Sequence, residues 1–240
     1  MQVNLIRPGL WRWTAPHPEW RPEKDRPGGW KEMVGCLCYE PPREAADALV
    51  LIDPLAPPAG TPDAKRFWDA LDRDVRRADK RVAILLGNYF HERSAQEIHD
   101  RYSARPGASI RLPEAARGRV ACSPTRPFRI GEALPGGVQA HPIRGLEASE
   151  TVYYLPPHRA LVFADSLVGV DGGRVRVPPA RWAPETPEGA ANYRAEFRAS
   201  LRPLLDLPVE ILLVSHGDPV LVNGHDALAE ALDAPAWGEG

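Results

Sequence analysis

The sequence predicts an α/β fold of the αββα type, in which two β-sheets lie face to face and helices cover their outer sides. Three observations support this prediction. Short apolar segments bounded by turn residues recur as strands, each half of the chain carries a helix that crosses between strands, and the order of elements is similar in both halves. The 240 residues suffice for one large core without a Gly/Ser-rich linker, so we expect a single domain over residues 1–240.

The first half of the chain is predicted to begin with strands and to continue through a helix. Apolar runs typical of strands cover residues 3–6, 10–13, 34–39, 48–52 and 82–86. Thr61 precedes Pro62, which is the arrangement of an N-cap followed by proline at the first helical position. Phe67, Leu71 and Val75 recur every fourth residue and give this helix one apolar face.

A second helix is predicted after the polar loop that follows residues 82–86. Ser94 and Glu97 have the spacing of a capping box, so we expect the helix to begin at Ser94. Pro106 and Gly107 are expected to end it. Later strands are expected at residues 109–112, 119–122, 138–143, 151–155, 160–164 and 209–214, and later helices at residues 190–205 and 226–232.

Polar side chains follow three of the predicted apolar strands. Asn88, Asp165 and His216 each come shortly after such a run. In α/β proteins, binding sites lie outside the carboxyl ends of the strands. We therefore expect these three side chains to line one shared pocket at one rim of the domain.

The segments around these residues resemble the metallo-β-lactamase-fold hydrolases. That family carries a His-x-His-x-Asp-His loop after a strand, a Gly-His-Thr turn, an aspartate at the end of a later strand and a final histidine after the last core strand. Asp165 and His216 match the last two positions, and residues 51–54 resemble the early turn with a strand-end aspartate. The loop positions hold Asn88, Phe90, Glu92 and Arg93, and Leu146 replaces the turn histidine.

The resemblance implies a metallo-β-lactamase-like αββα fold with a degenerate metal-binding motif. The family's first metal position falls on Asn88, Phe90 and Leu146. An amide, an aromatic ring and an aliphatic side chain do not hold a zinc ion, so we expect no ion at that position.

The family's second metal position falls on Glu92, Asp165 and His216, together with Arg93. Two carboxylates and an imidazole are suitable ligands, but Arg93 adds a fixed positive charge to the same space. The sequence therefore favours a protein without a bound cofactor. The alternative is one divalent metal, zinc, held by Glu92, Asp165 and His216.

Two functions stay open at this stage. In the first, a non-metal protein or pseudo-enzyme binds a small polar or anionic ligand, or a partner, where the family has its active site. In the second, a mononuclear-metal hydrolase cleaves an ester, thioester or amide. The predicted ligand-binding residues are Asn88, Glu92 and Arg93, and the predicted catalytic residues are Asp165, His216 and His91. The structural alternative is that His91 lies in solvent and that Asp165 caps a turn and bonds His216.

Arg93 has a specific expected role. Carboxylates gathered at the closed end of a pocket repel one another unless a cation lies between them. Since Arg93 stands at a position that ligates metal in the family, we expect its guanidinium to replace the ion and to pair with Asp165 and Glu92.

Composition and charge narrow the class of protein. The chain is 43% hydrophobic with a formal net charge of −2, which is typical of a soluble globular protein without a general affinity for nucleic acid. No apolar run approaches the ~18 residues of a membrane helix and no N-terminal signal pattern is present, so the expected location is the cytoplasm. The expected partner is a small molecule and not a membrane; a homodimer stays open.

Three other features carry weaker expectations. Residues 101–129 contain seven arginines against one acid, Glu114, and are interpreted as a solvated, charge-balanced surface in preference to a phosphate or nucleic-acid contact. The Pro- and Trp-rich residues 17–30 form either a lid over a pocket or a surface loop anchored by Trp20 and Trp30. The cysteines expected to be reduced and packed are Cys36, Cys38 and Cys122.

Overall fold

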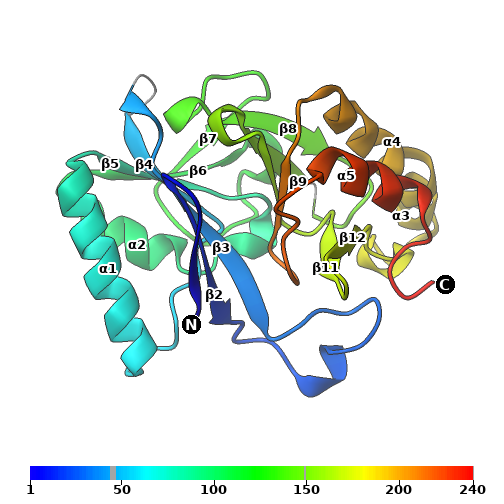
Figure 1. Ribbon diagram of the computed structural model, residues 1–240, viewed down its shortest axis with the longest axis horizontal. Coiled ribbons are helices and arrows are strands. Elements are labelled where there is room, and N and C mark those ends of the chain that lie inside the picture. Colours follow the sequence, from blue (N-terminus) through cyan, green and yellow to red (C-terminus); the bar gives the residue numbers. More distant parts are fainter. Residues whose placement is uncertain (44–46, 149, 240) are drawn as a thin grey trace. The chain divides into compact units, whose positions relative to one another are not determined.

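The computed structural model describes residues 1–43, 47–148 and 150–239 (Figure 1). The chain forms two compact units. The first consists of Met1–Glu19 and Met33–Val138, and the second of Trp20–Glu32 and Gln139–Gly240. The segment Trp20–Glu32 therefore belongs with the C-terminal half of the chain, although in sequence it interrupts the first unit. The single domain expected over residues 1–240 stays a prediction.

The first unit is built on a seven-stranded sheet with the order β1-β2-β3-β4-β5-β6-β7. Its strands are β1 (Val3–Arg7), β2 (Leu10–Pro16), β3 (Met33–Tyr39), β4 (Ala48–Ile52), β5 (Arg81–Leu85), β6 (Ala108–Pro113) and β7 (Thr125–Phe128). Strands β1 to β4 pair antiparallel, whereas β4 to β7 pair parallel. Because β4 and β5 are parallel neighbours, the residues that follow them, Asp53 and Gly87, emerge at the same edge of the sheet.

Helix α1 (Pro62–Ala78) connects β4 to β5 and begins as predicted (Figure 1). The Thr61 hydroxyl accepts a hydrogen bond from the Ala64 amide at 3.1 Å, which satisfies one of the free amides of the first turn. The residues of its buried face are Ala64, Phe67, Leu71 and Val75. The predicted apolar stripe is thus confirmed.

Helix α2 (Ala95–Tyr102) begins where predicted, but the predicted capping box is wrong. Ser94 occupies the N-cap position without making a side-chain capping bond. Its hydroxyl instead accepts a hydrogen bond from the Ala56 amide at 2.9 Å. A tertiary contact to the segment after β4 has taken precedence over the local cap. The helix ends at Tyr102, before Pro106.

The second unit is built on a four-stranded sheet with the order β13-β10-β9-β8 and on a separate two-stranded sheet of β11 and β12. Its strands are β8 (Gln139–Ile143), β9 (Glu150–Leu155), β10 (Ala160–Phe163), β11 (Val168–Val170), β12 (Arg174–Arg176) and β13 (Ile211–Val214). Strands β10 and β13 are parallel, and Phe163 pairs with Val214 in the last register position. Helix α5 (Gly224–Asp233) contacts β12 and β13 and buries Leu228 in the core of this unit.

A segmented helix precedes β13 in place of the single helix predicted over residues 190–205. It consists of α3 (Pro187–Asn192), a π-helical turn (Tyr193–Phe197), α4 (Arg198–Leu201) and a 3₁₀ turn (Arg202–Asp206). The predicted apolar side is buried: Tyr193, Phe197, Leu201 and Leu204. Gly145 packs against the π-helical turn so closely that an added Cβ would lie 2.9 Å from the Cβ of Phe197. Only glycine fits there.

The strand predicted over residues 119–122 is wrong. That segment is irregular, and the strand β7 follows later in the chain. The Glu92 carboxylate accepts hydrogen bonds from the amides of Ala121 at 2.7 Å and Cys122 at 3.3 Å. A side-chain acceptor therefore takes the place of a strand partner. Among the described residues, no helix is both long enough and apolar enough to cross a membrane, and the three cysteines are free thiols, as predicted.

The cap of α1 gives a first testable prediction. Thr61→Ala is expected to lower the free energy of unfolding by about 1 kcal/mol, because the Ala64 amide loses its acceptor. Thr61→Ser keeps the hydroxyl and is expected to remain near the wild-type value. Urea denaturation of the three proteins measures the difference, and equal losses in both variants would show that the hydroxyl does not act as a cap.

Candidate functional site

Asp53 is the central side chain of the candidate site in the first unit. It follows β4 directly and is buried, with 3% of its surface exposed. Its Oδ1 accepts a hydrogen bond from the Gly87 amide at 2.7 Å, and its Oδ2 lies 2.9 Å from His91 Nδ1. Asp53 has a φ of +49°, a left-handed conformation that is uncommon for residues other than glycine and asparagine or aspartate. The sequence pointed to this turn, but not to the contact with His91.

His91 lies at the end of the 3₁₀ turn Tyr89–His91 after β5 and is buried. Its Nε2 lies 3.2 Å from Nη2 of Arg93. Because a guanidinium has only donors, Nε2 accepts this bond, and the ring proton is on Nδ1, where it donates to Asp53. His91 is therefore held as a neutral imidazole between a carboxylate and a guanidinium. It is not the solvated loop residue of the structural alternative.

Arg93 connects the two other members of this group. Its Nη1 donates to the main-chain oxygen of Asp53 at 3.0 Å, while Nη2 reaches His91. Its φ of +38° is again left-handed, which is costly for a long side chain and marks a residue whose surroundings hold it in place. The expected pairing of Arg93 with Asp165 and Glu92 stays a prediction.

Asn88 and Glu92 act on the backbone of the first unit. The Asn88 side chain is buried, and its oxygen accepts a hydrogen bond from the Phe90 amide at 2.9 Å. Glu92 Oε2 is the oxygen that accepts from the two amides of residues 121–122. Binding of a metal ion by this oxygen would deprive both amides of their acceptor. The ligand roles of Asn88 and Glu92 stay predictions.

The second unit brings Asp165 and His216 together, as predicted from their positions after two apolar strands. Asp165 lies shortly after β10 and His216 shortly after β13, and these strands end side by side. His216 Nε2 lies 3.1 Å from Asp165 Oδ1, and both side chains are largely shielded from solvent. That Asn88 lies at the same rim stays a prediction.

Glu150, which the sequence did not single out, supports this pair from within the second unit. It begins β9 and has 2% of its surface exposed. Its carboxylate accepts hydrogen bonds from the amides of Ala164, Asp165 and Ser166 and from the Ser166 hydroxyl. Burial, with a further contribution from the charge of Asp165, raises the pKa of Glu150 to about 7. The only hint in the sequence was an acid at the start of an otherwise apolar strand.

Two tryptophans stand beside His216 in the second unit. The ring centroid of Trp30 lies 5.2 Å from that of His216, and the centroid of Trp182 lies 5.9 Å away. Trp182 Nε1 donates to the Gly28 oxygen at 3.0 Å, and Trp20 Nε1 donates to the Trp30 oxygen at 3.1 Å. Trp20 and Trp30 of the Trp-rich loop thus bond each other, Gly28 of the loop bonds Trp182, and Trp30 supplies an aromatic neighbour to His216. Both interpretations of the loop, a lid or an anchored surface loop, stay predictions.

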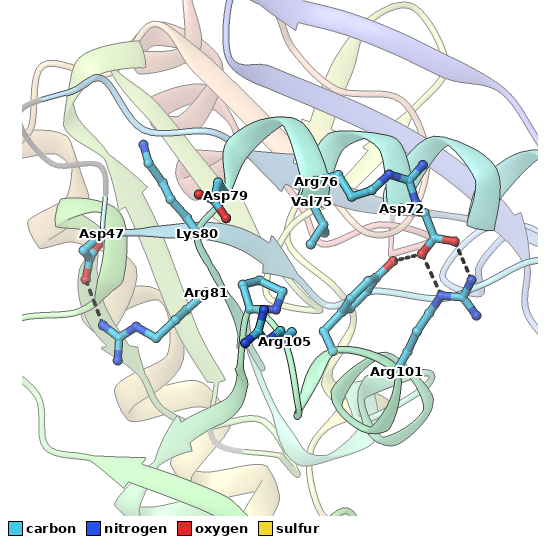
Figure 2. A pocket seen from close by; sticks show the side chains of 11 residues that line it. Asp47, Asp72, Val75, Arg76, Asp79, Lys80, Arg81, Arg101 and Arg105 are labelled. Carbon is cyan, nitrogen blue, oxygen red and sulfur yellow. Dashed lines mark hydrogen bonds and ion pairs between the residues drawn. The ribbon is translucent and has the colours of Figure 1, made fainter.

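A separate pocket of about 880 Å³ lies in the first unit, between the C-terminal parts of α1 and α2 (Figure 2). Arg101 Nε donates to Asp72 Oδ1 at 2.8 Å, and the Tyr102 hydroxyl donates to the same oxygen at 2.7 Å. Arg81, at the start of β5, lies 3.9 Å from Asp47. The pocket is therefore at the amino ends of the parallel strands, opposite the edge that carries Asp53, and it contains none of the predicted site residues.

Two arginines of the arginine-rich residues 101–129, Arg101 and Arg105, line this pocket. Three of these arginines form ion pairs with acids of the first unit: Arg101 with Asp72, Arg111 with Glu132 and Arg129 with Glu114. These pairs support the interpretation of a charge-balanced surface.

His216 Nε2 and Asp165 Oδ1 are in direct hydrogen-bond contact, as the structural alternative predicted, and their separation is also compatible with two ligands of one metal ion. In a tetrahedral zinc site with bonds of ~2.0–2.1 Å, neighbouring ligand atoms are roughly 3.3 Å apart. The facing oxygen and nitrogen of this pair are 3.1 Å apart, and both are atoms that zinc binds. In contrast, Phe90 is 52% exposed and Leu146 is buried, and neither carries a donor atom. That no ion occupies the family's first metal position stays a prediction.

Comparisons with known proteins were informative for structure alone. No family model matches the sequence, and no curated protein matches it. A β-lactamase domain protein from Burkholderia ambifaria is 15% identical, with 95% of this chain and 74% of that chain covered and a TM-score of 0.63. A metallo-β-lactamase family protein from Thermus thermophilus is 18% identical, with 95% and 80% covered and a TM-score of 0.61.

A third solved structure is the metallo-β-lactamase FIM-1 from Pseudomonas aeruginosa in a mono-zinc form. It is 10% identical to this chain, with 97% of this chain and 94% of that chain covered and a TM-score of 0.56. Similarity at this level of identity establishes the fold. It confirms the predicted fold class and leaves the activity to be argued from the site.

The contacts of Arg93 give a second prediction. Arg93→Ala is expected to lower the free energy of unfolding by roughly 1–3 kcal/mol, because it removes the hydrogen bonds that Arg93 makes to the main-chain oxygen of Asp53 and to the His91 ring. Arg93→Lys is expected to recover only part of the loss, since an ammonium group does not bridge two acceptors as a planar guanidinium does.

Arg117→Ala is the matched control, because Arg117 is an exposed arginine of the same unit. It is expected to stay within about 0.5 kcal/mol of the wild type. If denaturation midpoints of the Arg93 and Arg117 variants coincide, the network around Arg93 does not stabilise the fold.

Proposed function

This chain has the metallo-β-lactamase fold, and on that premise we propose that it is a hydrolase that holds one divalent metal ion, zinc, with Asp165 and His216. The observation that carries the proposal is the 3.1 Å separation of His216 Nε2 from Asp165 Oδ1, at the adjoining ends of β10 and β13. Coordination positions beyond these two remain for further donors and for the substrate. The sequence-based proposal of Glu92 as one of those donors stays a prediction.

The expected substrate contains an ester, thioester or amide carbonyl. A bound zinc ion supplies Lewis-acid polarisation of such a carbonyl. The indoles of Trp30 and Trp182 shield His216 from water and offer apolar surface to the part of a substrate that lies beside it. The catalytic role predicted for His91 stays a prediction: in the first unit Asp53 Oδ2 faces its Nδ1 and Arg93 Nη2 faces its Nε2.

A second candidate function is binding of a small anionic ligand without metal. The contact between Arg93 Nη2 and His91 Nε2 favours it, because it places a fixed positive charge on the histidine atom that a cation would otherwise bind. In this alternative the guanidinium of Arg93 leaves His91 to meet the ligand. Asn88 continues to hold the turn that carries them.

Zinc titration of metal-free protein tests the proposal. The wild type is expected to bind a single equivalent of zinc, and Asp165→Asn and His216→Ala are each expected to weaken binding by about tenfold or more, since each removes a ligand. Calorimetry measures the affinities, and elemental analysis of protein purified without chelator measures the native metal content.

The surface pair His225 and Asp226 provides a matched control, because the same two residue types face each other there at 3.4 Å in exposed positions. His225→Ala and Asp226→Asn are expected to leave zinc binding unchanged. A wild type that binds no zinc would refute the metal-dependent function. A titration of the wild type with inorganic phosphate and with acetate would then test the alternative. Arg93→Ala is expected to abolish binding of these anions.

A further inference from the structure

We propose that Glu150 is a positioning residue of the site: its buried carboxylate shapes the turn of residues 164–166 so that Asp165 faces His216. The expected effect of Glu150 on metal binding rests on the proposed function. The expected effect of Glu150 on the geometry of Asp165 and His216 does not depend on the proposed function, and it is tested separately.

The position of Glu150 in the second unit brings its carboxylate into direct contact with the turn of residues 164–166. It is the first residue of β9, which pairs antiparallel with β10. The start of β9 therefore lies beside the end of β10, where the chain turns through Asp165. Since 2% of Glu150 is exposed, water does not replace its carboxylate as the acceptor for this turn.

The carboxylate satisfies every donor that the turn directs at it. Oε2 accepts from the amides of Asp165 and Ser166, each at 2.7 Å. Oε1 accepts from the amide of Ala164 at 3.0 Å and from the Ser166 hydroxyl at 2.6 Å. Three consecutive amides thus point at one side chain. Such a set of donors fixes the backbone from which the Asp165 side chain projects.

A carboxylate is the side chain that this arrangement requires. The two oxygens of the ionised carboxylate accept all four bonds without presenting a donor. Glutamine has the same shape, but its NH₂ group would face donors, and the amides opposite it would be buried without an acceptor. A shift of the turn to recover these bonds would displace Asp165 from His216. Glu150 therefore acts on the site through the backbone and does not touch a substrate.

The test compares Glu150→Gln with the wild type by two measurements. The first is the imidazole nitrogen chemical shifts of His216 in the metal-free protein, with His225 as an internal reference outside the turn. The second is the zinc affinity. Glu150→Gln is expected to shift the His216 signals, to leave those of His225 unchanged and to weaken zinc binding by about tenfold, the size found when groups that orient a ligand are lost.

Ser166→Ala is the graded control. It removes the hydroxyl donor to Glu150 and keeps the three amide bonds. It is expected to change the His216 signals and the zinc affinity less than Glu150→Gln does. If Glu150→Gln does not fold, Glu150→Asp takes its place. Aspartate keeps the negative charge, but its side chain is shorter and does not reach all three amides. Glu150→Asp is therefore expected to shift the His216 signals from their wild-type positions.

The outcomes separate this inference from the proposed function. A lower melting temperature with unchanged His216 signals and unchanged zinc affinity would overturn it and would leave Glu150 a residue of the fold alone. If the wild type binds no zinc, the proposed function fails, while a His216 shift in Glu150→Gln still supports the positioning role. Unchanged His216 signals in Glu150→Asp would likewise overturn it.

Discussion

Buried carboxylates that accept amide hydrogen bonds are the feature on which the geometry of both units depends. The turns that follow parallel strands contain amides without ladder partners, and buried amides need acceptors. In the first unit Asp53 accepts from Gly87, and in the second unit Glu150 accepts from residues 164–166. In each unit the carboxylate is almost fully buried, and in each it adjoins a residue with catalytic potential, His91 or Asp165.

The two carboxylates nevertheless act differently. Asp53 bonds the His91 ring itself and thereby decides which nitrogen carries the proton. Glu150 bonds main-chain amides and leaves the carboxylate of Asp165 available to His216. The first arrangement leaves Nε2 of His91 as the nitrogen without a proton. The second places Asp165 Oδ1 and His216 Nε2 side by side as two candidate metal ligands. Both arrangements bury a carboxylate, and burying a carboxylate without hydrogen-bond partners costs free energy. Each carboxylate is therefore surrounded by specific hydrogen-bond partners.

Residues that follow apolar strands were predictable from sequence, whereas the residues that support them were not. Asp165 and His216 were expected to lie together because each comes after a buried strand, and the parallel pairing of β10 with β13 accounts for that result. Glu150 gave no comparable signal, since its partners are main-chain amides that have no sequence signature. Ser94 and residues 119–122 were assigned to local structure, but their hydrogen bonds go to Ala56 and Glu92. Tertiary contacts of this kind override local propensity.

Amide hydrogen exchange of the wild type tests the role of the buried carboxylates most directly. The amides of Gly87, Asp165 and Ser166 lie outside the strands, where exchange is ordinarily fast. Because each donates to a buried carboxylate, we predict that they exchange as slowly as the strand amides of Leu85 and Val162. Exchange at the rate of exposed turns would contradict the account, because it would show that neither carboxylate holds its turn.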